Sequence, residues 1–240
     1  MKYGILYGIG VGPGDPELLT LKAVRVLNTV QRLYAAASTK NTYSSALGAV
    51  ERCLLPGTQV EKLFFPMTRD QEELQKAWEG NARKILAELE KGVSCGFLTL
   101  GDPMTYSTFG YLMRTLREIA PAVPLEVVPG ITSYHAAAAA SGFVLAEREE
   151  SLAVVSGAKG GERLRRLAQS PENPDGARNV AVLKVYKNFK DIQATLKELD
   201  MLEGSVLVSR CGLEGEIIVR DVAQNSLSPE YFSLILARKS

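Results

Sequence analysis

The feature that most constrains the fold is the alternation of short β-type runs with helical patterns along the chain. Residues 3–10 and 32–37 have the composition of strands, and residues 17–28 and 43–54 have the pattern of helices. Such alternation predicts an α/β fold, in which helices cover a largely parallel sheet. Further strands are expected at residues 93–100, 125–128, 152–156, 180–185, 205–209 and 232–237.

The alternation begins a second time after residue 120, which predicts two domains. A chain of 240 residues, of which 46% are hydrophobic, can bury either one large core or two smaller ones. The segment from Pro121 to Pro124 interrupts the pattern and is the expected boundary. We therefore expect one α/β domain at residues 1–120 and another at residues 121–240. A long amphipathic helix at residues 70–91 is expected to be a scaffold element of the first domain.

The charge balance and the cysteine content indicate which partners to exclude and which cellular compartment to expect. The 28 lysines and arginines are balanced by 27 acidic residues, so no global field attracts nucleic acid or an anionic membrane surface. The first residues do not resemble a signal peptide, and the small-residue run from Ala136 to Ala140 is too short to cross a membrane. Three cysteines without a CxxC spacing predict neither a disulfide framework nor a metal site. We expect a cytoplasmic protein without nucleic acid or membrane partners.

Residues 10–20, with the sequence GVGPGDPELLT, form a glycine-rich turn between an expected strand and an expected helix. A dinucleotide site is disfavoured, because Pro13 or Asp15 replaces the third glycine of the GxGxxG pattern. The carboxylate of Asp15 would also lie where a pyrophosphate binds at a helix start. Asp15 followed by Pro16 instead predicts a helix N-cap with proline at the first helical position. Pro13 and the glycines are candidates for close approach to a ligand.

Two more small-residue turns follow expected strands. Residues 98–109 have the sequence LTLGDPMTYSTF, and residues 127–133 have the sequence VVPGITS. In open α/β sheets, ligands bind at the carboxyl ends of the strands, where such turns lie. In this order and at this spacing, the three motifs resemble those of the tetrapyrrole methylase family, and the resemblance covers nearly the whole chain.

The resemblance implies a fold and a cofactor. Family members have two α/β domains with a trough between them, where S-adenosylmethionine binds largely through backbone groups and is converted to S-adenosylhomocysteine. Carried over by motif, the cofactor-contacting positions of the first half are Pro13, Leu100, Gly101, Asp102, Thr105, Tyr106, Ser107, Thr108, Thr132 and Ser133. Looser matches in the second half are Val185, Tyr186, Cys211 and Gly212. Such a ligand needs donors and acceptors at short range more than it needs phosphate-binding charge.

Within the family, four segments are most similar to the precorrin-2 C-20 methyltransferases. These are residues 43–46 (YSSA), 65–68 (FPMT), 106–109 (YSTF) and 233–239 (SLILARK). The similarity implies direct methyl transfer to C-20 of precorrin-2 or cobalt-factor II in cobalamin biosynthesis, with no metal and no covalent enzyme intermediate. Methylases of precorrin-4 at C-11 or of uroporphyrinogen III would use the same cofactor site. They stay open as alternatives, as does a non-catalytic protein that binds a tetrapyrrole or S-adenosylmethionine.

Few side chains are candidates for catalysis or for substrate binding. Asp102 is expected to orient the cofactor, with capping of the next helix as the alternative, and Tyr106 to contact the substrate or help remove a proton. The single histidine, His135, is expected to be structural or peripheral. The carboxylates of a tetrapyrrole predict cations near strand ends. The candidates are Lys40, Arg69, Lys159, Lys184 and Arg210, of which Lys40, Arg69 and Lys184 are favoured. The family resemblance also implies a homodimer.

Overall fold

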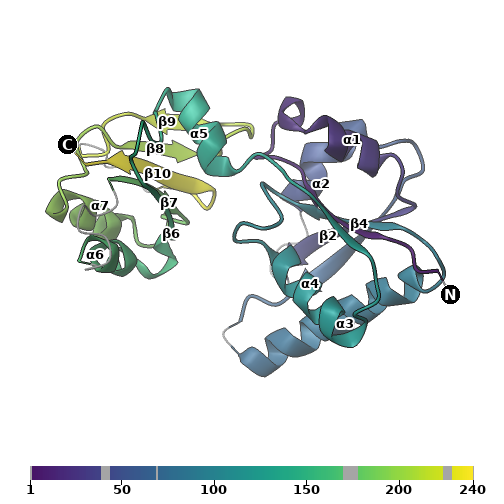
Figure 1. Ribbon diagram of the computed structural model, residues 1–240. Coiled ribbons are helices and arrows are strands. Elements are labelled where there is room, and N and C mark those ends of the chain that lie inside the picture. Colours follow the sequence, from purple (N-terminus) through teal and green to yellow (C-terminus); the bar gives the residue numbers. More distant parts are fainter. Residues whose placement is uncertain (1, 39–43, 69, 170–177, 224–228, 240) are drawn as a thin grey trace. The chain divides into compact units, whose positions relative to one another are not determined.

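The computed structural model describes residues 2–38, 44–68, 70–169, 178–223 and 229–239. The chain divides into two compact units, Met1–Thr132 and Ser133–Ser240, each with its own five-stranded sheet (Figure 1). The predicted α/β class is confirmed, because helices cover both sheets. Among the described helices, none combines the length and the apolar character that a membrane span requires.

The first unit is a parallel sheet with helices on both faces. Its strands are β1 (Leu6–Gly10), β2 (Arg32–Ser38), β3 (Gln59–Phe65), β4 (Cys95–Thr99) and β5 (Leu125–Val128). They lie in the order β3-β2-β4-β1-β5, and every pairing is parallel. The helices are α1 (Leu21–Leu27), α2 (Ser45–Val50), α3 (Gln71–Leu89) and α4 (Thr108–Ile119). One core lies under α3 and α4, and a second lies under α1 and α2 on the opposite face (Figure 1).

Glycines in the central strands make room for bulky side chains of the two cores. A Cβ on Gly8 of β1 would lie 2.3 Å from the ring of Phe109, a fully buried residue of α4. On the other face, a Cβ on Gly96 of β4 would lie 2.7 Å from Leu33. Because Gly8 has no side chain, α4 packs close to β1 through Phe109 in its first turn.

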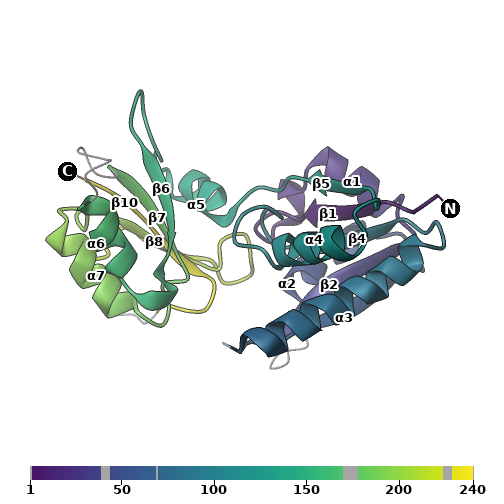
Figure 2. The same ribbon diagram turned by 60° about the horizontal axis from the view of Figure 1, so that its bottom comes forward.

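The second unit has a mixed sheet. Its strands are β6 (Leu152–Ser156), β7 (Asn179–Leu183), β8 (Val206–Ser209), β9 (Ile217–Val219) and β10 (Ser233–Arg238), in the order β6-β7-β10-β8-β9. Two helices, α6 (Glu162–Ala168) and α7 (Phe189–Glu198), bury Leu164, Ile192 and Leu196 against one face. Figure 2 shows α5 (Ser133–Ser141) on the opposite face.

The domain boundary expected at residues 120 and 121 lies too early. β5 pairs in parallel with β1, from Leu125 opposite Leu6 to Val128 opposite Ile9, so it belongs to the first sheet. The Pro121–Pro124 segment connects α4 to this strand, and the structure divides after Thr132 instead.

Strand direction in the second unit also differs from the expectation of a largely parallel sheet. β6 and β7 are parallel, but β10 is antiparallel to both β7 and β8, and β8 is antiparallel to β9. Hydrophobic periodicity predicts that a segment is a strand but not which neighbour it will pair with. β3 and β9 were not predicted, because charged residues interrupt the pattern of the first and the second spans only three residues.

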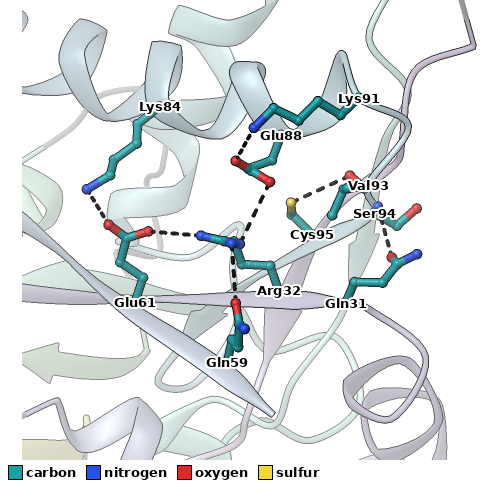
Figure 3. Close-up of polar contacts among 10 residues, drawn as sticks. All are labelled: Gln31, Arg32, Gln59, Glu61, Lys84, Glu88, Lys91, Val93, Ser94 and Cys95. Atoms are coloured by element: carbon teal, nitrogen blue, oxygen red, sulfur yellow. Dashed lines mark hydrogen bonds and ion pairs between the residues drawn. The ribbon is translucent and has the colours of Figure 1, made fainter. Parts of the chain in front are cut away.

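Charged side chains connect α3 to the amino ends of β2 and β3 (Figure 3). Arg32 lies between two carboxylates, with Nη1 3.7 Å from Glu61 and Nε 3.9 Å from Glu88. Lys91 donates to Glu88 at 2.9 Å, and Lys84 pairs with Glu61. The hydrogen bond from Lys91, followed by the charges of Lys91 and Arg32, lowers the pKa of Glu88. The contacts that Glu88 makes with Arg32 and Lys91 therefore stabilise the fold most while Glu88 is ionised.

We predict that Glu88→Gln lowers stability near neutral pH and reduces its dependence on acid. A carboxyl whose pKa is lowered by folding stabilises the folded state above its unfolded pKa, and this stabilisation disappears as the pH falls through the folded pKa. The urea midpoint of the wild type should therefore fall more steeply than that of the variant below about pH 5.

Glu72→Gln is the matched control for this measurement. Glu72 lies 3.9 Å from Lys76 on the same helix, and both side chains are more than four-fifths exposed (87% and 81%). Exposed pairs of this kind contribute little, so its acid slope should equal that of the wild type. A Glu88→Gln slope that also equals that of the wild type would contradict the role given to Arg32 and Lys91.

Candidate functional site

Three loops lie side by side at the carboxyl edge of the first sheet. They follow β1, β4 and β5, and they contain the three motifs that the sequence singled out. Because β1 pairs in parallel with both β4 and β5, the ends of these strands are neighbours. Segments more than a hundred residues apart in the sequence therefore share one edge, which is where ligands of open α/β sheets bind.

The backbones of the three loops are in direct contact at glycines. The N–H of Gly101 donates to the carbonyl of Gly12 at 2.6 Å, and the two residues form an isolated bridge. A Cβ on Gly130 would lie 2.1 Å from the carbonyl oxygen of Gly101, and a Cβ on Gly10 would lie 2.5 Å from the nitrogen of Gly130. No other residue type fits at Gly10 or Gly130 without separating the loops.

Asp102 holds two of these loops together. Its Oδ1 accepts hydrogen bonds from the N–H of Met104 at 2.9 Å and from the hydroxyl of Thr105 at 3.4 Å. Its Oδ2 accepts from the N–H of Gly130 at 3.1 Å. The carboxylate thus closes the turn after β4 and joins that turn to the loop after β5.

The alternative role for Asp102, as the cap of the next helix, is wrong. α4 begins at Thr108, and Ser107 is its N-cap, with Oγ accepting from the N–H of Phe109 at 3.0 Å. Pro103 lies in the turn before the helix rather than at its first position. A serine just before a helical run competes with the Asp-Pro signal, and here the serine is the cap.

The capping role of Asp15 is confirmed. Its Oδ1 accepts from the N–H of Glu17 at 2.9 Å, at the start of a short 3-10 helix formed by Pro16–Leu18. Thr20 then caps α1, so the single helix expected at residues 17–28 is two separate elements. Pro13 is buried at the base of this loop. The loop is therefore fixed by its own hydrogen bonds before any ligand binds.

The edge has space and polar groups for a ligand that carries no phosphate group. A Cβ on Gly101, whose φ is 76°, would have no neighbour closer than the Cα of Thr132 at 4.0 Å. Thr99, aligned with Gly10 on the adjacent strand, has a buried hydroxyl without a hydrogen-bond partner in the described part of the chain. Such groups suit the donors and acceptors of S-adenosylmethionine, and the N-cap role of Asp15 leaves no phosphate site at that helix start.

The other predicted contacts of the first unit lie along the same loops. Leu100, Thr105 and Thr108 are partly buried. Tyr106 is 48% exposed and has a φ of 49°, a left-handed conformation that is uncommon for a tyrosine. Thr132 ends the first unit, and Ser133 begins α5 of the second.

In the second unit, the predicted residues lie at one edge of the sheet. Lys184, Val185 and Tyr186 follow β7, and Cys211 and Gly212 follow β8. Both strands are antiparallel to β10, which lies between them, so their carboxyl ends are at the same edge. Burial raises the pKa of the Cys211 thiol to about 12, so this cysteine is a neutral packing residue near neutral pH.

Two of the predicted cations cannot be placed in the site, and the single histidine lies on α5. Lys40 and Arg69, predicted to bind the substrate, lie outside the described residues. His135 is exposed on the first turn of α5, with its ring 4.5 Å from that of Tyr134. Within the described ranges, no group of histidine, cysteine, aspartate and glutamate residues could hold a metal ion.

Gly130 was not among the predicted contacts, although a glycine two residues after a strand is a usable signal for close backbone approach.

Sequence comparison gives a family and close relatives. The chain matches the family of tetrapyrrole (corrin/porphyrin) methylases over residues 5–225. A cobalt-precorrin-2 C(20)-methyltransferase from Salmonella typhimurium is 37% identical, over 98% of this chain and 97% of that protein. A precorrin-2 C(20)-methyltransferase from a Sinorhizobium species is 29% identical, over 97% and 94% of the two chains.

A solved structure extends the comparison to the fold and to a bound ligand. The crystal structure of a uroporphyrin-III C-methyltransferase from Thermus thermophilus, in complex with S-adenosylhomocysteine, superposes with a TM-score of 0.64. It is 27% identical in sequence, and the match covers 98% of this chain and 97% of that one.

We predict that Gly130→Ala weakens S-adenosylmethionine binding at least about tenfold, as measured by calorimetry, because the added Cβ forces the loops apart. The control is Gly110→Ala on α4, where a Cβ would meet nothing within 4 Å. That change should leave affinity unchanged and stabilise the helix by about 0.5–1 kcal/mol. Wild-type affinity in Gly130→Ala would show that the loop contacts do not shape the cofactor site.

Asp102→Asn is expected to lower the free energy of unfolding by about 1–3 kcal/mol and to weaken the cofactor complex. Both carboxylate oxygens of Asp102 accept from backbone N–H groups, and an amide offers an acceptor to only one of them. Asp70→Asn is the control, because one oxygen of Asp70 accepts from both Glu72 and Glu73 at the start of α3. Urea unfolding of both variants measures the two losses of stability. Equal losses would contradict the role of Asp102 in joining the two loops.

Proposed function

Because the chain belongs to the family of tetrapyrrole (corrin/porphyrin) methylases, we propose that it methylates C-20 of cobalt-precorrin-2 with S-adenosylmethionine, in cobalamin biosynthesis. One observation carries the proposal. Three glycine-closed loops at the carboxyl edge of the first sheet offer backbone groups and open space beside Gly101, rather than phosphate-binding charge. Near full-length identity of 37% to a C(20)-methyltransferase supports the choice of position on the ring.

The contribution of the chain is to hold and orient the reactants. When bound, S-adenosylmethionine supplies a sulfonium methyl group that a nucleophilic ring carbon displaces directly. Pro13, Gly101 and the turn closed by Asp102 are the groups of the first unit proposed to hold it. Pre-arranged geometry of two reactants can lower a barrier by roughly 7–11 kcal/mol, so no strong acid or base is required.

Asp102 is proposed to act as a positioning residue, because its two oxygens accept hydrogen bonds from the protein itself. Tyr106 is the better candidate for contact with substrate, since its side chain is nearly half exposed beside the same turn. Burial raises the pKa of Cys95 to about 11 and that of Cys211 to about 12. Neither thiol is ionised near neutral pH, which supports a mechanism without a covalent cysteine intermediate.

We favour the cobalt-containing ring over the metal-free one. Identity is 37% to the cobalt-precorrin-2 enzyme and 29% to the precorrin-2 enzyme, over similar shares of this chain. The ring atoms attacked are the same in both substrates, so the cofactor site serves either. Lys184, exposed at the carboxyl edge of the second sheet, is proposed to bind a substrate carboxylate.

The proposal includes a homodimer, which the family resemblance implies, and a cytoplasmic location, which the three cysteines without a CxxC spacing favour. Gel filtration with light scattering tests the assembly, and a monomer mass would contradict it.

The reaction is tested by incubating the enzyme with carbon-13-methyl S-adenosylmethionine and either cobalt-factor II, its reduced cobalt-precorrin-2 form, or precorrin-2. We expect one labelled methyl at C-20 of the cobalt-containing ring, detected by NMR and mass spectrometry. Faster transfer to precorrin-2 would reverse the choice of metal state. Cofactor binding without transfer to any ring would favour a carrier protein or another tetrapyrrole substrate.

A further inference from the structure

The helix α5 carries no charged residue on either side. Its sequence, SYHAAAAAS, contains no aspartate, glutamate, lysine or arginine, whereas α6 and α7 on the opposite face of the sheet each contain four. Residues 136–138 are buried where α5 packs against β8 and β10. His135, Ala139 and Ala140 on the other side are exposed. A helix that is apolar all round is normally covered on both sides, so a partner is expected on the exposed side.

A hollow lies beside this exposed side. Gly142 follows the end of α5 with a φ of 71°, and the N–H of Phe143 donates to the carbonyl of Ala138 at 3.0 Å, so the chain turns sharply there. The hollow between the helix, the loop after it and the start of β6 has a volume of about 610 Å³. We call it the α5 hollow. Its apolar lining consists mainly of Ala138, Ala139, Gly142, Phe143, Leu145 and Leu152.

The lining of the α5 hollow does not suit either reactant. Among the described residues that line it, none is an aspartate, glutamate, lysine or arginine, and His135 is the only one that titrates near neutral pH. An acidic tetrapyrrole would require cations, and the amino acid head of S-adenosylmethionine would require charged or polar partners. The hollow is therefore better matched to an apolar side chain.

Val144 is such a side chain, at the rim of the hollow itself. It is 53% exposed, whereas Phe143 and Leu145 on either side of it are partly buried. In a two-fold contact the same surface is present on both sides, so a projection beside a hollow is complementary to itself. Arg148 and Glu149 are exposed in the same loop, and a two-fold contact pairs such opposite charges in both directions. Both features favour a second copy of this chain as the occupant.

Polar contacts hold the walls of the hollow in place. Nη1 of Arg220 donates to the carbonyl of Ser141 at the end of α5. Arg238 of β10 pairs with Glu147 at 3.1 Å and with Glu150 at 2.6 Å, which fixes the loop between α5 and β6. A surface that is already ordered loses less conformational entropy on association, which favours a stable interface.

We propose that the α5 hollow is the interface of the homodimer. Val144 of each copy inserts into the hollow of the other, and Arg148 of each copy pairs with Glu149 of the other across the two-fold axis. An apolar centre with a charged rim is the usual composition of a subunit interface. This contact goes beyond the proposed reaction, because it concerns assembly and not methyl transfer.

The first test is Ala139→Glu, measured by sedimentation equilibrium of the full chain without ligands. Ala139 is exposed on α5 and glutamate is a good helix former, so the circular dichroism spectrum should match that of the wild type. We expect the dissociation constant of the dimer to rise at least about a hundredfold, because the interface would bury a carboxylate without a partner. Val144→Ala should raise it about tenfold through lost apolar contact.

The charged rim has its own test. Arg148→Glu should weaken the dimer about tenfold by placing like charges together, and the exchange Arg148→Glu/Glu149→Arg should restore it. Failure of the exchange to restore the dimer would contradict the two-fold arrangement.

Ala194→Glu is the matched control, because Ala194 is an exposed alanine on α7, on the opposite face of the same sheet. It should leave the dimer unchanged, and an equal loss in both glutamate variants would overturn the assignment to α5. So would an Ala139→Glu chain that stays dimeric, including one that loses only stability or cofactor affinity through a contact within one chain or with a ligand. A wild-type monomer would overturn the interface and the homodimer together. Methyl transfer is measured separately, so its failure would leave this interface standing.

Discussion

The contact among the backbones of Gly10, Gly101 and Gly130 is the constraint on which the rest of the site depends. A side chain at Gly10 or Gly130 would collide with backbone atoms at 2.1–2.5 Å, so the three loops can meet only because these positions lack a Cβ. Asp102 then fixes the geometry with hydrogen bonds to two of the loops. An enzyme that works mainly by orienting two reactants needs this rigidity more than it needs acid or base groups.

The strand ends of the two units differ in the residues that they present to a ligand. The first uses glycines and short side chains, which bring backbone donors and acceptors close to a ligand. The second has cationic residues in left-handed conformations at its strand ends, next to exposed aromatic rings. The cofactor contacts expected from the family resemblance lie at both edges, since Val185, Tyr186, Cys211 and Gly212 follow β7 and β8 of the second sheet.

The features of the fold and of the site that depend on a few neighbouring residues could be predicted from the sequence. The motifs around Gly12, Gly101 and Gly130 follow strands as predicted, and the Asp15 cap is encoded within three residues. The cap of α4 was missed, because Asp102 and Ser107 carry competing signals and only tertiary contacts choose between them. The insertion of β10 between β7 and β8 also could not be predicted, since it joins segments about fifty residues apart and no periodicity encodes direction.

Hydrogen exchange with and without S-adenosylmethionine is the most direct test of the central claim, that the three glycine-closed loops hold the cofactor. The account predicts slower amide exchange on binding in residues 11–15, 100–107 and 129–133. It predicts no change around Arg32, Glu61 and Glu88 at the opposite edge of the same sheet. Protection at that opposite edge, or unchanged exchange in the three loops of a saturated complex, would contradict it.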